Sequence, residues 1–284
     1  MATIAFLGTG LLGSAFAEAA AKRGDTVTAW NRSIDKVQAL AQFGVKAAAT
    51  PADAVRGASR VHIVLKDDAI VEEVISAARS GLSPDAILID HTTTLPTLTA
   101  ERAKRLHAAG IKYLHCPVFM GPAAARNAQG SMMAAGPKAL FESVQADLAK
   151  MTSRLEYLGE RSDLAAANKL FGNAMIIGLS AVMADVLTLA QASDVNGEDA
   201  IKLLSLLDLN SMVPVRGVNM AKGNFTPSFE LAMARKDVRL MLETTGDRPM
   251  AALPAVAARM DQLIAAGHGA EDASVVGIDA VSRG

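Results

Sequence analysis

Hydrophobic positions in the first half of the chain alternate between short continuous runs and helical spacing. Short apolar runs that end in Gly, Pro or polar residues are typical of buried strands. The predicted strands are residues 2–7, 26–30, 61–65, 86–89, 111–115, 131–135 and 154–157. The predicted helices between them are residues 15–23, 34–42, 51–56, 69–79, 98–109 and 137–151. This alternation predicts crossover connections and a mostly parallel sheet with helices on both faces.

The second half of the chain has helical spacing throughout. A long helix is predicted from Leu164 to about Ser193. Shorter helices are predicted at residues 198–206, 214–220, 228–245, 253–266 and 271–278. We therefore expect a Rossmann-like, doubly wound α/β sheet in residues 1–162. An all-α C-terminal domain, residues 163–284, would follow and would begin with a long interdomain helix.

The long helix is apolar on nearly all sides between Phe171 and Asp194. Its segment 174–190 is apolar enough to suggest a membrane span, but Asp185 and the interspersed Ser and Thr residues favour a helix buried in protein. A small helical domain cannot cover such a helix alone. We therefore expect no membrane association and a homodimer or homotetramer built through this half of the chain.

A Gly-rich turn follows the first predicted strand directly and leads into a predicted helix. Gly8, Gly10 and Gly13 form the pattern G-x-G-x-x-G. The first glycine permits the turn, the second lets the backbone approach a pyrophosphate, and the third lets the helix pack closely on the strand. Free N–H groups at the start of the helix suit phosphate. We therefore expect a dinucleotide on this turn, with Leu11 and Leu12 among its contacts.

The end of the second predicted strand indicates which dinucleotide is bound. An acidic residue that binds the ribose of NAD(H) usually lies here, about twenty residues after the glycines. This chain instead has Asn31, Arg32 and Ser33. The Arg32 guanidinium suits a phosphate group, and the other two side chains add neutral donors. The expected cofactor is therefore NADP(H) rather than NAD(H). The structural alternative is that Arg32 is a solvated charge and that Ser33 caps the next helix.

Composition and charge narrow the class of protein. The 284 residues are 51% apolar with a net charge of −1, so nothing indicates binding to nucleic acid or to a membrane surface. The single cysteine, Cys116, allows no intrachain disulfide and fits a reducing compartment, so a cytoplasmic location is expected. The start of the chain lacks the basic region of a signal peptide. The scattered histidines lack metal-ligand spacing, and no metal is expected.

Further motifs along the whole chain match one family. They are the Gly8–Gly13 turn, residues 90–96 (against D-x-S-T-x-x-P), residues 117–121 (against P-V-S-G-G), Lys169 with Asn173, and Lys236 with Asp237. With these motifs the chain resembles the β-hydroxyacid dehydrogenases, which include 3-hydroxyisobutyrate dehydrogenase, tartronate semialdehyde reductase and the glyoxylate/succinic semialdehyde reductases. The resemblance implies an NADP(H)-dependent oxidoreductase that transfers hydride reversibly between nicotinamide and a small aldehyde or keto acid, or its hydroxyacid.

The resemblance also implies roles for individual residues. Lys169 and Asn173 lie one helical turn apart on one face, where an ammonium could protonate a carbonyl oxygen and the amide could orient it. Thr93 follows a predicted strand and is assigned to the cofactor ribose or to the substrate. The structural alternatives are that Lys169 is a surface lysine at the start of a helix and that Thr93 caps a helix.

Other residues are expected at the cofactor or in its surroundings. Leu65 and Lys66 end an earlier predicted strand at the same edge of the sheet, so their backbone is expected to line the cofactor. Lys236 resembles the family's cofactor-contacting lysine. His91 and His115 are expected to be pocket-wall or core histidines rather than acid–base groups.

The first departure from the family pattern concerns the turn before Lys169. Two of the family's glycines are missing there and one residue is extra, so a gapless match would place Asn168 at the catalytic position. We prefer Lys169, because Asn173 then falls one turn later, as it does in the family.

The second departure is Phe119 and Met120 in place of the family's Ser and Gly, just before Gly121. The family uses this turn to hold the substrate carboxylate. The expected substrate contacts are Thr93, Phe119, Met120, Gly121, Lys169 and Asn173. An apolar wall favours a substrate with a hydrocarbon or aromatic part. Two alternatives stay open: a reductase of a bulkier, less anionic carbonyl or of an imine, and a catalytically silent dinucleotide-binding module.

Overall fold

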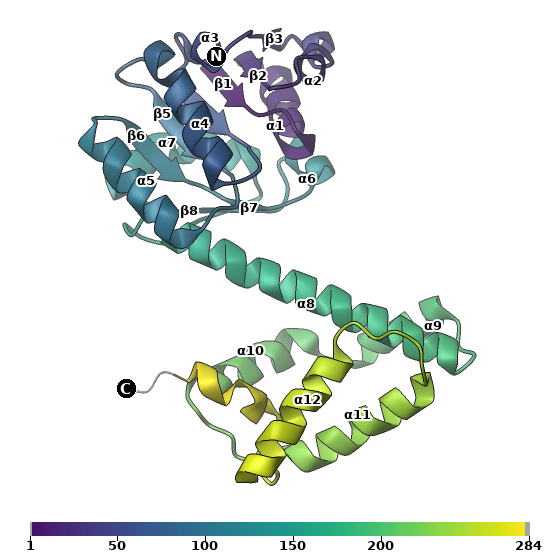
Figure 1. Ribbon diagram of the computed structural model, residues 1–284. Helices are drawn as coiled ribbons and strands as arrows, with labels where there is room; N and C mark the ends of the chain where they lie inside the picture. Colours follow the sequence, from purple (N-terminus) through teal and green to yellow (C-terminus); the bar gives the residue numbers. More distant parts are fainter. Residues whose placement is uncertain (1, 282–284) are drawn as a thin grey trace. The chain divides into compact units, whose positions relative to one another are not determined.

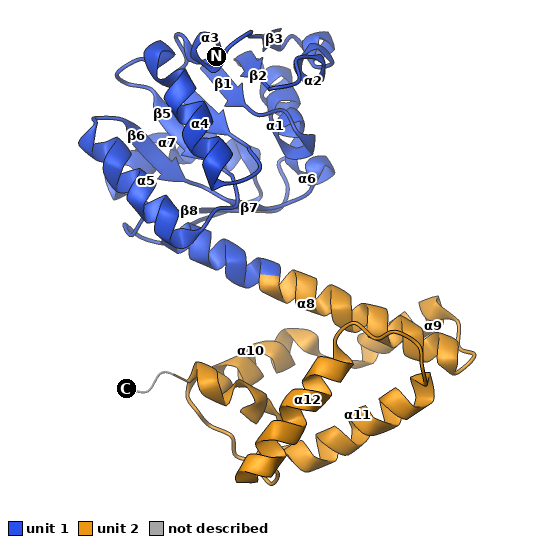
Figure 2. Cartoon of the chain, viewed as in Figure 1, with its two compact units in different colours: residues 1–173 blue, residues 174–284 orange. Residues whose placement is uncertain are grey.

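The computed structural model describes residues 2–281 and divides the chain into two compact units, residues 1–173 and residues 174–284 (Figure 2). The division falls inside α8 (Leu164–Ala192), the long helix expected from the sequence. The first turns of α8 belong to unit 1, and the remaining turns belong to unit 2.

Unit 1 is built on a six-stranded parallel sheet with the strand order β3-β2-β1-β4-β5-β6 (Figure 1). The strands are β1 (Thr3–Leu7), β2 (Thr26–Trp30), β3 (Lys46–Ala47), β4 (Arg60–Ile63), β5 (Ile87–Asp90) and β6 (Lys112–His115). The winding reverses between β1 and β4, which is the order of a doubly wound fold. The Rossmann-like prediction is therefore confirmed. Within this sheet only β3 was missed, because its two exposed residues form no apolar run.

Helices cover both faces of this sheet. They are α1 (Leu11–Lys22), α2 (Asp35–Gln38), α3 (Pro51–Val55), α4 (Asp68–Ala78), α5 (Pro96–Ala108), α6 (Pro122–Arg126) and α7 (Lys138–Leu148). Successive side chains of β1 point to opposite faces. Ile4 and Phe6 pack in one core with α1 and α7, whereas Ala5 and Leu7 pack in another with α3, α4 and α5.

A second sheet of three strands corrects the predicted topology. β7 (Val118–Phe119), β8 (Ser131–Ala134) and β9 (Arg154–Tyr157) pair in that order, with β7 antiparallel to β8 and β8 parallel to β9. The expectation that residues 131–135 and 154–157 continue the parallel sheet is wrong. The parallel ladder ends after β6 because the next residues include Pro117, which has no N–H to donate.

Unit 2 is helical in the part of the chain that the structure describes. After the end of α8 come α9 (Gly197–Lys202), α10 (Leu209–Ala221), α11 (Leu231–Thr245) and α12 (Leu253–Leu263), followed by the short helical turns Ile264–His268 and Ala273–Ala280. Leu231, Val238, Met260 and Leu263 form the centre of its core.

Asp185 in α8 holds the start of α12. Its carboxylate accepts N–H bonds from Ala252 at 2.9 Å and Leu253 at 2.8 Å, and a third from Ala251. Only 1% of Asp185 is exposed. Burial alone would raise the pKa of Asp185, but the three backbone donors outweigh it and hold that pKa below its ordinary value. This acidic residue therefore has a structural role within unit 2.

The apolar side chains of α8 are mostly exposed in the single chain. Among the described residues, α8 is the one helix long and apolar enough to cross a membrane, with a mean hydropathy of 1.8, and 6% of its apolar window is buried. Ile177 is 69% exposed and Met175 is 59% exposed. The helix is therefore not covered by its own domain.

Candidate active site

A cavity of about 540 Å³ lies at the carboxyl edge of the parallel sheet. The ends of parallel strands are where open α/β sheets bind ligands. Most of the predicted cofactor residues line this cavity, namely Gly8, Gly10, Leu11, Leu12, Asn31, Arg32, Ser33, Leu65, Lys66 and Thr93. All of these residues belong to unit 1.

The three glycines have different structural roles. Gly8 has φ +100°, and a Cβ there would lie 2.1 Å from Val64 O. A Cβ on Gly13 would lie 2.1 Å from Gly8 O, so this glycine lets α1 pack against the loop without lining the cavity. A Cβ on Gly10 would meet no atom within 4 Å, because this residue faces the cavity. The turn can therefore bring its backbone against a bulky anion.

The amino end of α1 faces this cavity. The helix begins at Leu11 with no side-chain cap, and the first N–H groups of an α-helix have no partner within the helix. The Asn31 side chain supports the loop, since Oδ1 accepts the Thr9 N–H at 3.1 Å and Nδ2 donates to Ser33 O at 3.1 Å. Asn31 therefore shapes the loop as well as lining the cavity.

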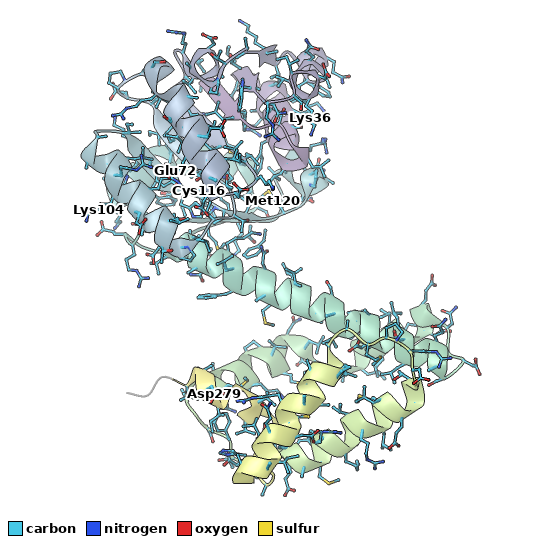
Figure 3. All side chains as sticks on the ribbon, in the orientation of Figure 1. Lys36, Glu72, Lys104, Cys116, Met120 and Asp279 are labelled. Carbon is cyan, nitrogen blue, oxygen red and sulfur yellow. The ribbon has the colours of Figure 1, made fainter. Side chains whose placement is uncertain are left out.

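Two cations lie at the β2 end of the cavity. Arg32 and Lys36 are both exposed and both line it, together with Ser33 (Lys36 is labelled in Figure 3). Lys36 was not predicted from the sequence to lie at the cofactor cavity, although its position one helical turn after Arg32 could have indicated it. The next helix, α2, begins at Asp35 after Ile34 and has no side-chain cap, so Ser33 does not cap it. This pair of charges fits a phosphate group on the ribose.

Thr93 lies in the loop between β5 and α5 and faces the cavity with an exposed side chain. The residue before α5 is Leu95, and its side chain makes no capping bond, so Thr93 is not the helix cap. The neighbouring Thr92 Oγ1 accepts the Leu65 N–H at 3.1 Å, which joins this loop to the loop after β4. Two walls of the cavity are therefore bonded to each other.

Lys169 lies in the first turns of α8 and points toward β7. Its Nζ donates to Val118 O at 2.7 Å and lies 4.1 Å from the centroid of the Phe119 ring. Partial burial lowers the pKa of Lys169. The Asn168 side chain instead donates to Leu164 O at 2.8 Å, within its own helix. This geometry supports Lys169 over Asn168 as the functional residue.

The Phe119 ring packs directly against α8. A Cβ on Gly172 would lie 2.1 Å from Phe119 Cζ, so the ring occupies the groove that this glycine leaves open. The described residues other than glycine with positive φ are Ala128 and Asp194, so the backbone at positions 119 and 120 requires no glycine. The replacement of Ser and Gly by Phe and Met is therefore compatible with an unstrained turn.

Met120, the residue after β7, packs in a different core cluster from Phe119. Its side chain packs against the core that contains Ile4 and Phe6, and a Cβ on Gly130 would lie 2.7 Å from Met120 Cβ (Met120 is labelled in Figure 3). Gly121 precedes α6 and has open space at its Cβ position. Of the two bulky replacements, Phe119 is the one that contacts the Lys169 helix.

The predicted substrate residues do not all lie at the described cavity. Thr93 lines it, whereas Phe119, Met120, Gly121, Lys169 and Asn173 form the part of unit 1 around β7 and the start of α8. Lys236 belongs to α11 of unit 2, where its Nζ lies 2.9 Å from the Asp237 carboxylate. Its contact with the cofactor remains a prediction.

Buried histidines lie behind the cavity. His91 lines it, and its Nδ1 lies 2.7 Å from Cys116 O, so this nitrogen donates. His62 Nδ1 then donates to His91 Nε2 at 2.9 Å, because that nitrogen is left as the acceptor. Burial lowers the pKa of His91 to about 4, lowers that of His115, and raises that of the Cys116 thiol. These groups are neutral near pH 7. Within residues 2–281 no cluster of His, Cys, Asp or Glu could hold a metal ion.

Comparison with known protein families agrees with this site. A model described as the NAD binding domain of 6-phosphogluconate dehydrogenase matches residues 3–159, and one described as NAD-binding of NADP-dependent 3-hydroxyisobutyrate dehydrogenase matches residues 164–277. The fold and the cavity thus define a protein that binds a nicotinamide dinucleotide. The chain belongs to the β-hydroxyacid dehydrogenase family of the 3-hydroxyisobutyrate dehydrogenase type, an oxidoreductase family.

Curated relatives extend over most of the chain. An uncharacterised oxidoreductase of Shewanella frigidimarina is 30% identical over 267 residues, 92% of this chain and 91% of its own length. Glyoxylate/succinic semialdehyde reductase 1 of Arabidopsis thaliana is 29% identical over 90% of this chain and 89% of its own length. Cytokine-like nuclear factor N-PAC of Xenopus tropicalis is 29% identical over 84% of this chain, but the chain spans only 45% of that relative.

Solved structures share the fold. An imine reductase of Streptomyces aurantiacus superposes with a TM-score of 0.89 at 23% identity, over 99% of this chain and all of that chain. The imine reductase of Myxococcus stipitatus, in complex with NADP+, has a TM-score of 0.86 at 21% identity, over 96% of this chain and 98% of that chain. A variant of that enzyme was solved with NAD+.

Proposed function

We propose that this protein is an NADP(H)-dependent reductase of a small carbonyl compound, working reversibly, in which Lys169 is the proton donor. The observation that carries the proposal is the placement of the Lys169 ammonium, which is partly desolvated and lies between Val118 O and the Phe119 ring. The proposed reaction is that of a dehydrogenase that acts on CH–OH groups, in the direction that reduces the carbonyl to the alcohol.

The residues of the cavity fit a nicotinamide dinucleotide. Gly10 and the start of α1 offer a place for the pyrophosphate, and the β4 and β5 loops form the opposite wall. When bound, the nicotinamide would supply or accept the hydride. The preference for NADP(H) over NAD(H) is supported by Arg32 and Lys36, which would pair with the 2′-phosphate. Their loss should weaken binding of the phosphorylated cofactor alone.

The Lys169 ammonium has one donor already committed. An ammonium carries three N–H groups, and one bonds Val118 O while the aromatic face of Phe119 covers another side. The remaining donor is available for a carbonyl oxygen, and Asn173, one turn later, would orient it. A lowered pKa makes proton transfer to the developing alkoxide easier, and in the reverse direction it favours the neutral amine as the base.

The substrate is proposed to carry an apolar group and little negative charge. Phe119 replaces the small hydroxyl residue with which the family holds a carboxylate, and its ring lies against the Lys169 helix. Reduction of an imine is the second candidate, because the same replacement also suits an uncharged C=N substrate. The Streptomyces and Myxococcus imine reductases share the fold, which supports this candidate by analogy only.

Assembly is part of the proposal. The exposed apolar residues of α8 in unit 2, such as Ile177 and Leu179, are a surface that a second copy of the chain would cover. We propose a cytoplasmic homodimer or homotetramer that acts on a small molecule and binds neither nucleic acid nor a membrane. Light scattering that gives a 29.5 kDa monomer at micromolar concentration would contradict the assembly.

A substrate panel tests the activity. The purified protein should oxidise NADPH faster than NADH when it is offered neutral aldehydes or ketones, and more slowly with glyoxylate. A preference for cyclic imines over every carbonyl would favour the second candidate. Binding of NADPH with no reduction of aldehyde, ketone or imine, and no oxidation of a hydroxyacid with NADP+, would contradict the proposal and support a silent binding module.

A further inference from the structure

Arg102 in α5 is a fully buried charged side chain, and its carboxylate partners come from two other elements. Its Nη2 donates to Asp68 at 2.7 Å and its Nε donates to Glu72 at 2.7 Å, both on α4. Its Nη1 lies 3.6 Å from Asp90 at the end of β5. A buried guanidinium must be paired with acceptors, so this cluster is fixed.

Two of these carboxylates also hold the loop between β5 and α5. Asp90 Oδ1 accepts the Thr92 N–H at 2.9 Å, and Asp68 Oδ2 accepts the Leu95 N–H at 2.9 Å. Each carboxylate therefore uses one oxygen for the loop and turns the other toward Arg102. Thr93 lies between these two held positions and faces the cavity.

The Tyr113 hydroxyl completes the arrangement around Asp90. It donates to Asp90 Oδ2 at 2.9 Å, and Arg102 Nη1 lies 3.5 Å from the hydroxyl oxygen. Burial raises the pKa of Tyr113, so the hydroxyl stays neutral and keeps its proton for this bond. Tyr113 and Arg102 both lie at Oδ2 of Asp90, so the other oxygen, Oδ1, is left to accept the Thr92 N–H of the loop.

We propose that Asp68 is a positioning residue: oriented by Arg102, its carboxylate holds the Leu95 N–H, as Asp90 holds the Thr92 N–H, so that Thr93 is presented to the bound cofactor or substrate. The inference rests on the proposed function for the role of Thr93. Charge-assisted hydrogen bonds are the strong ones, and both ends of the loop are held by them. Neither Arg102 nor Asp68 lines the cavity itself.

Asp68 and Glu72 provide a matched pair of variants. Both lie on α4, and both bind Arg102 at 2.7 Å, but only Asp68 also holds the loop. Asp68→Ala is preferable to a change at Arg102, because removal of that guanidinium would leave the buried Asp90 carboxylate without a cation. Glu72→Ala, which also releases Arg105, is the control for loss of an Arg102 contact.

The experiment uses the full-length protein and two readouts. Hydrogen exchange of the peptide that covers residues 91–95 should become faster in Asp68→Ala and stay unchanged in Glu72→Ala. With NADPH and the best aldehyde of the panel, kcat/KM should fall about tenfold in Asp68→Ala, as expected for one charge-assisted hydrogen bond, and less than twofold in Glu72→Ala.

A double-mutant cycle with Thr93→Ala separates positioning from general stability. If Asp68 acts through Thr93, then Asp68→Ala should have little further effect in the Thr93→Ala protein. Additive losses, equal losses in the Asp68 and Glu72 variants, or unchanged exchange of residues 91–95 would overturn the proposal. A wild-type protein without reductase activity would contradict the proposed function. The hydrogen-exchange comparison of Asp68→Ala with Glu72→Ala would still be valid, because hydrogen exchange requires no turnover.

Discussion

The Phe119 ring centroid lies 4.1 Å from Lys169 Nζ, and the same ring fills the groove left open by Gly172. A cation over an aromatic face is stabilised by about 0.5–2 kcal/mol, depending on how far water is excluded. Phe119 thus holds the ammonium on one side while Val118 O holds it on another. This contact links the residue that departs most from the family pattern to the residue proposed to move the proton.

Gly172→Ala should disturb this contact. The new Cβ would lie 2.1 Å from Phe119 Cζ, so the ring must move away from α8 and uncover Lys169. We expect kcat to fall and NADPH affinity to stay unchanged. Gly178→Ala on the same helix is the control, because its Cβ meets no atom within 4 Å. In a Phe119→Ala background the ring is already absent, so Gly172→Ala should cause little further loss of kcat, and an equal further loss would contradict the packing account.

Phe119→Ser should change which substrates are accepted. A small hydroxyl residue restores the family's side chain and opens space beside Lys169. The ratio of kcat/KM for a carboxylated aldehyde over a neutral aldehyde of equal length should therefore rise. Met120→Leu is the control, since Met120 packs into the core. A natural protein that already prefers glyoxylate to every larger carbonyl would contradict the proposal that Phe119 forms an apolar wall of the substrate site.

Arg32→Ala and Lys36→Ala should separate the two cofactors. Each variant loses one cation at the cavity, and one charge-assisted contact with a phosphate contributes about 1.5–3 kcal/mol. We expect KM for NADPH to rise at least tenfold and KM for NADH to change little. Equal use of NADPH and NADH by the unmodified protein would count against a phosphate site here.

Asp185→Asn should lower the stability of unit 2. The carboxylate accepts three N–H bonds at the start of α12, and an amide replaces one of its acceptors with a donor. The expected loss near pH 7 is about 1–3 kcal/mol in the free energy of unfolding. Thr188→Ala, which removes only a hydroxyl bonded to Ala184 O within α8, should lose much less.

The effect of Asp185 should also depend on pH. Its folded-state pKa is lowered, so its stabilisation is present above the ordinary carboxyl pKa of about 3.9 and is lost as pH falls through the folded value. The difference between wild type and Asp185→Asn in urea unfolding should therefore shrink in acid. A difference that grew as pH fell would contradict this assignment.

Much of the fold follows from sequence pattern, because most strands of the parallel sheet in unit 1 consist mainly of apolar residues bounded by polar residues or glycine. β2 and β9 have their predicted bounds. β7 is too short to show a pattern, and the antiparallel turn after Pro117 depends on tertiary pairing. Helix α10 extends on both sides of Pro214, which the sequence suggested as its first residue, because Asp208 caps it earlier.

The cavity was also largely predictable, since Gly8 and Arg32 belong to motifs with a physical cause. The buried histidine pair and the Arg102 cluster were not. Their residues are scattered along the sequence, and only the pairing of β4 with β5 and the packing of α4 near α5 bring them together. Polar residues that meet through tertiary contacts leave no local spacing to detect.

The central claim is that Lys169 donates the proton, and the most direct test is kcat for Lys169→Ala beside Asn168→Ala. General acid catalysis is worth about two to four orders of magnitude, so Lys169→Ala should lose that much in kcat while NADPH affinity persists. Reduction by wild type should also decline as pH rises through the lowered Lys169 pKa, because the ammonium is the active form. Near-normal kcat in Lys169→Ala, or a large loss confined to Asn168→Ala, would contradict the account.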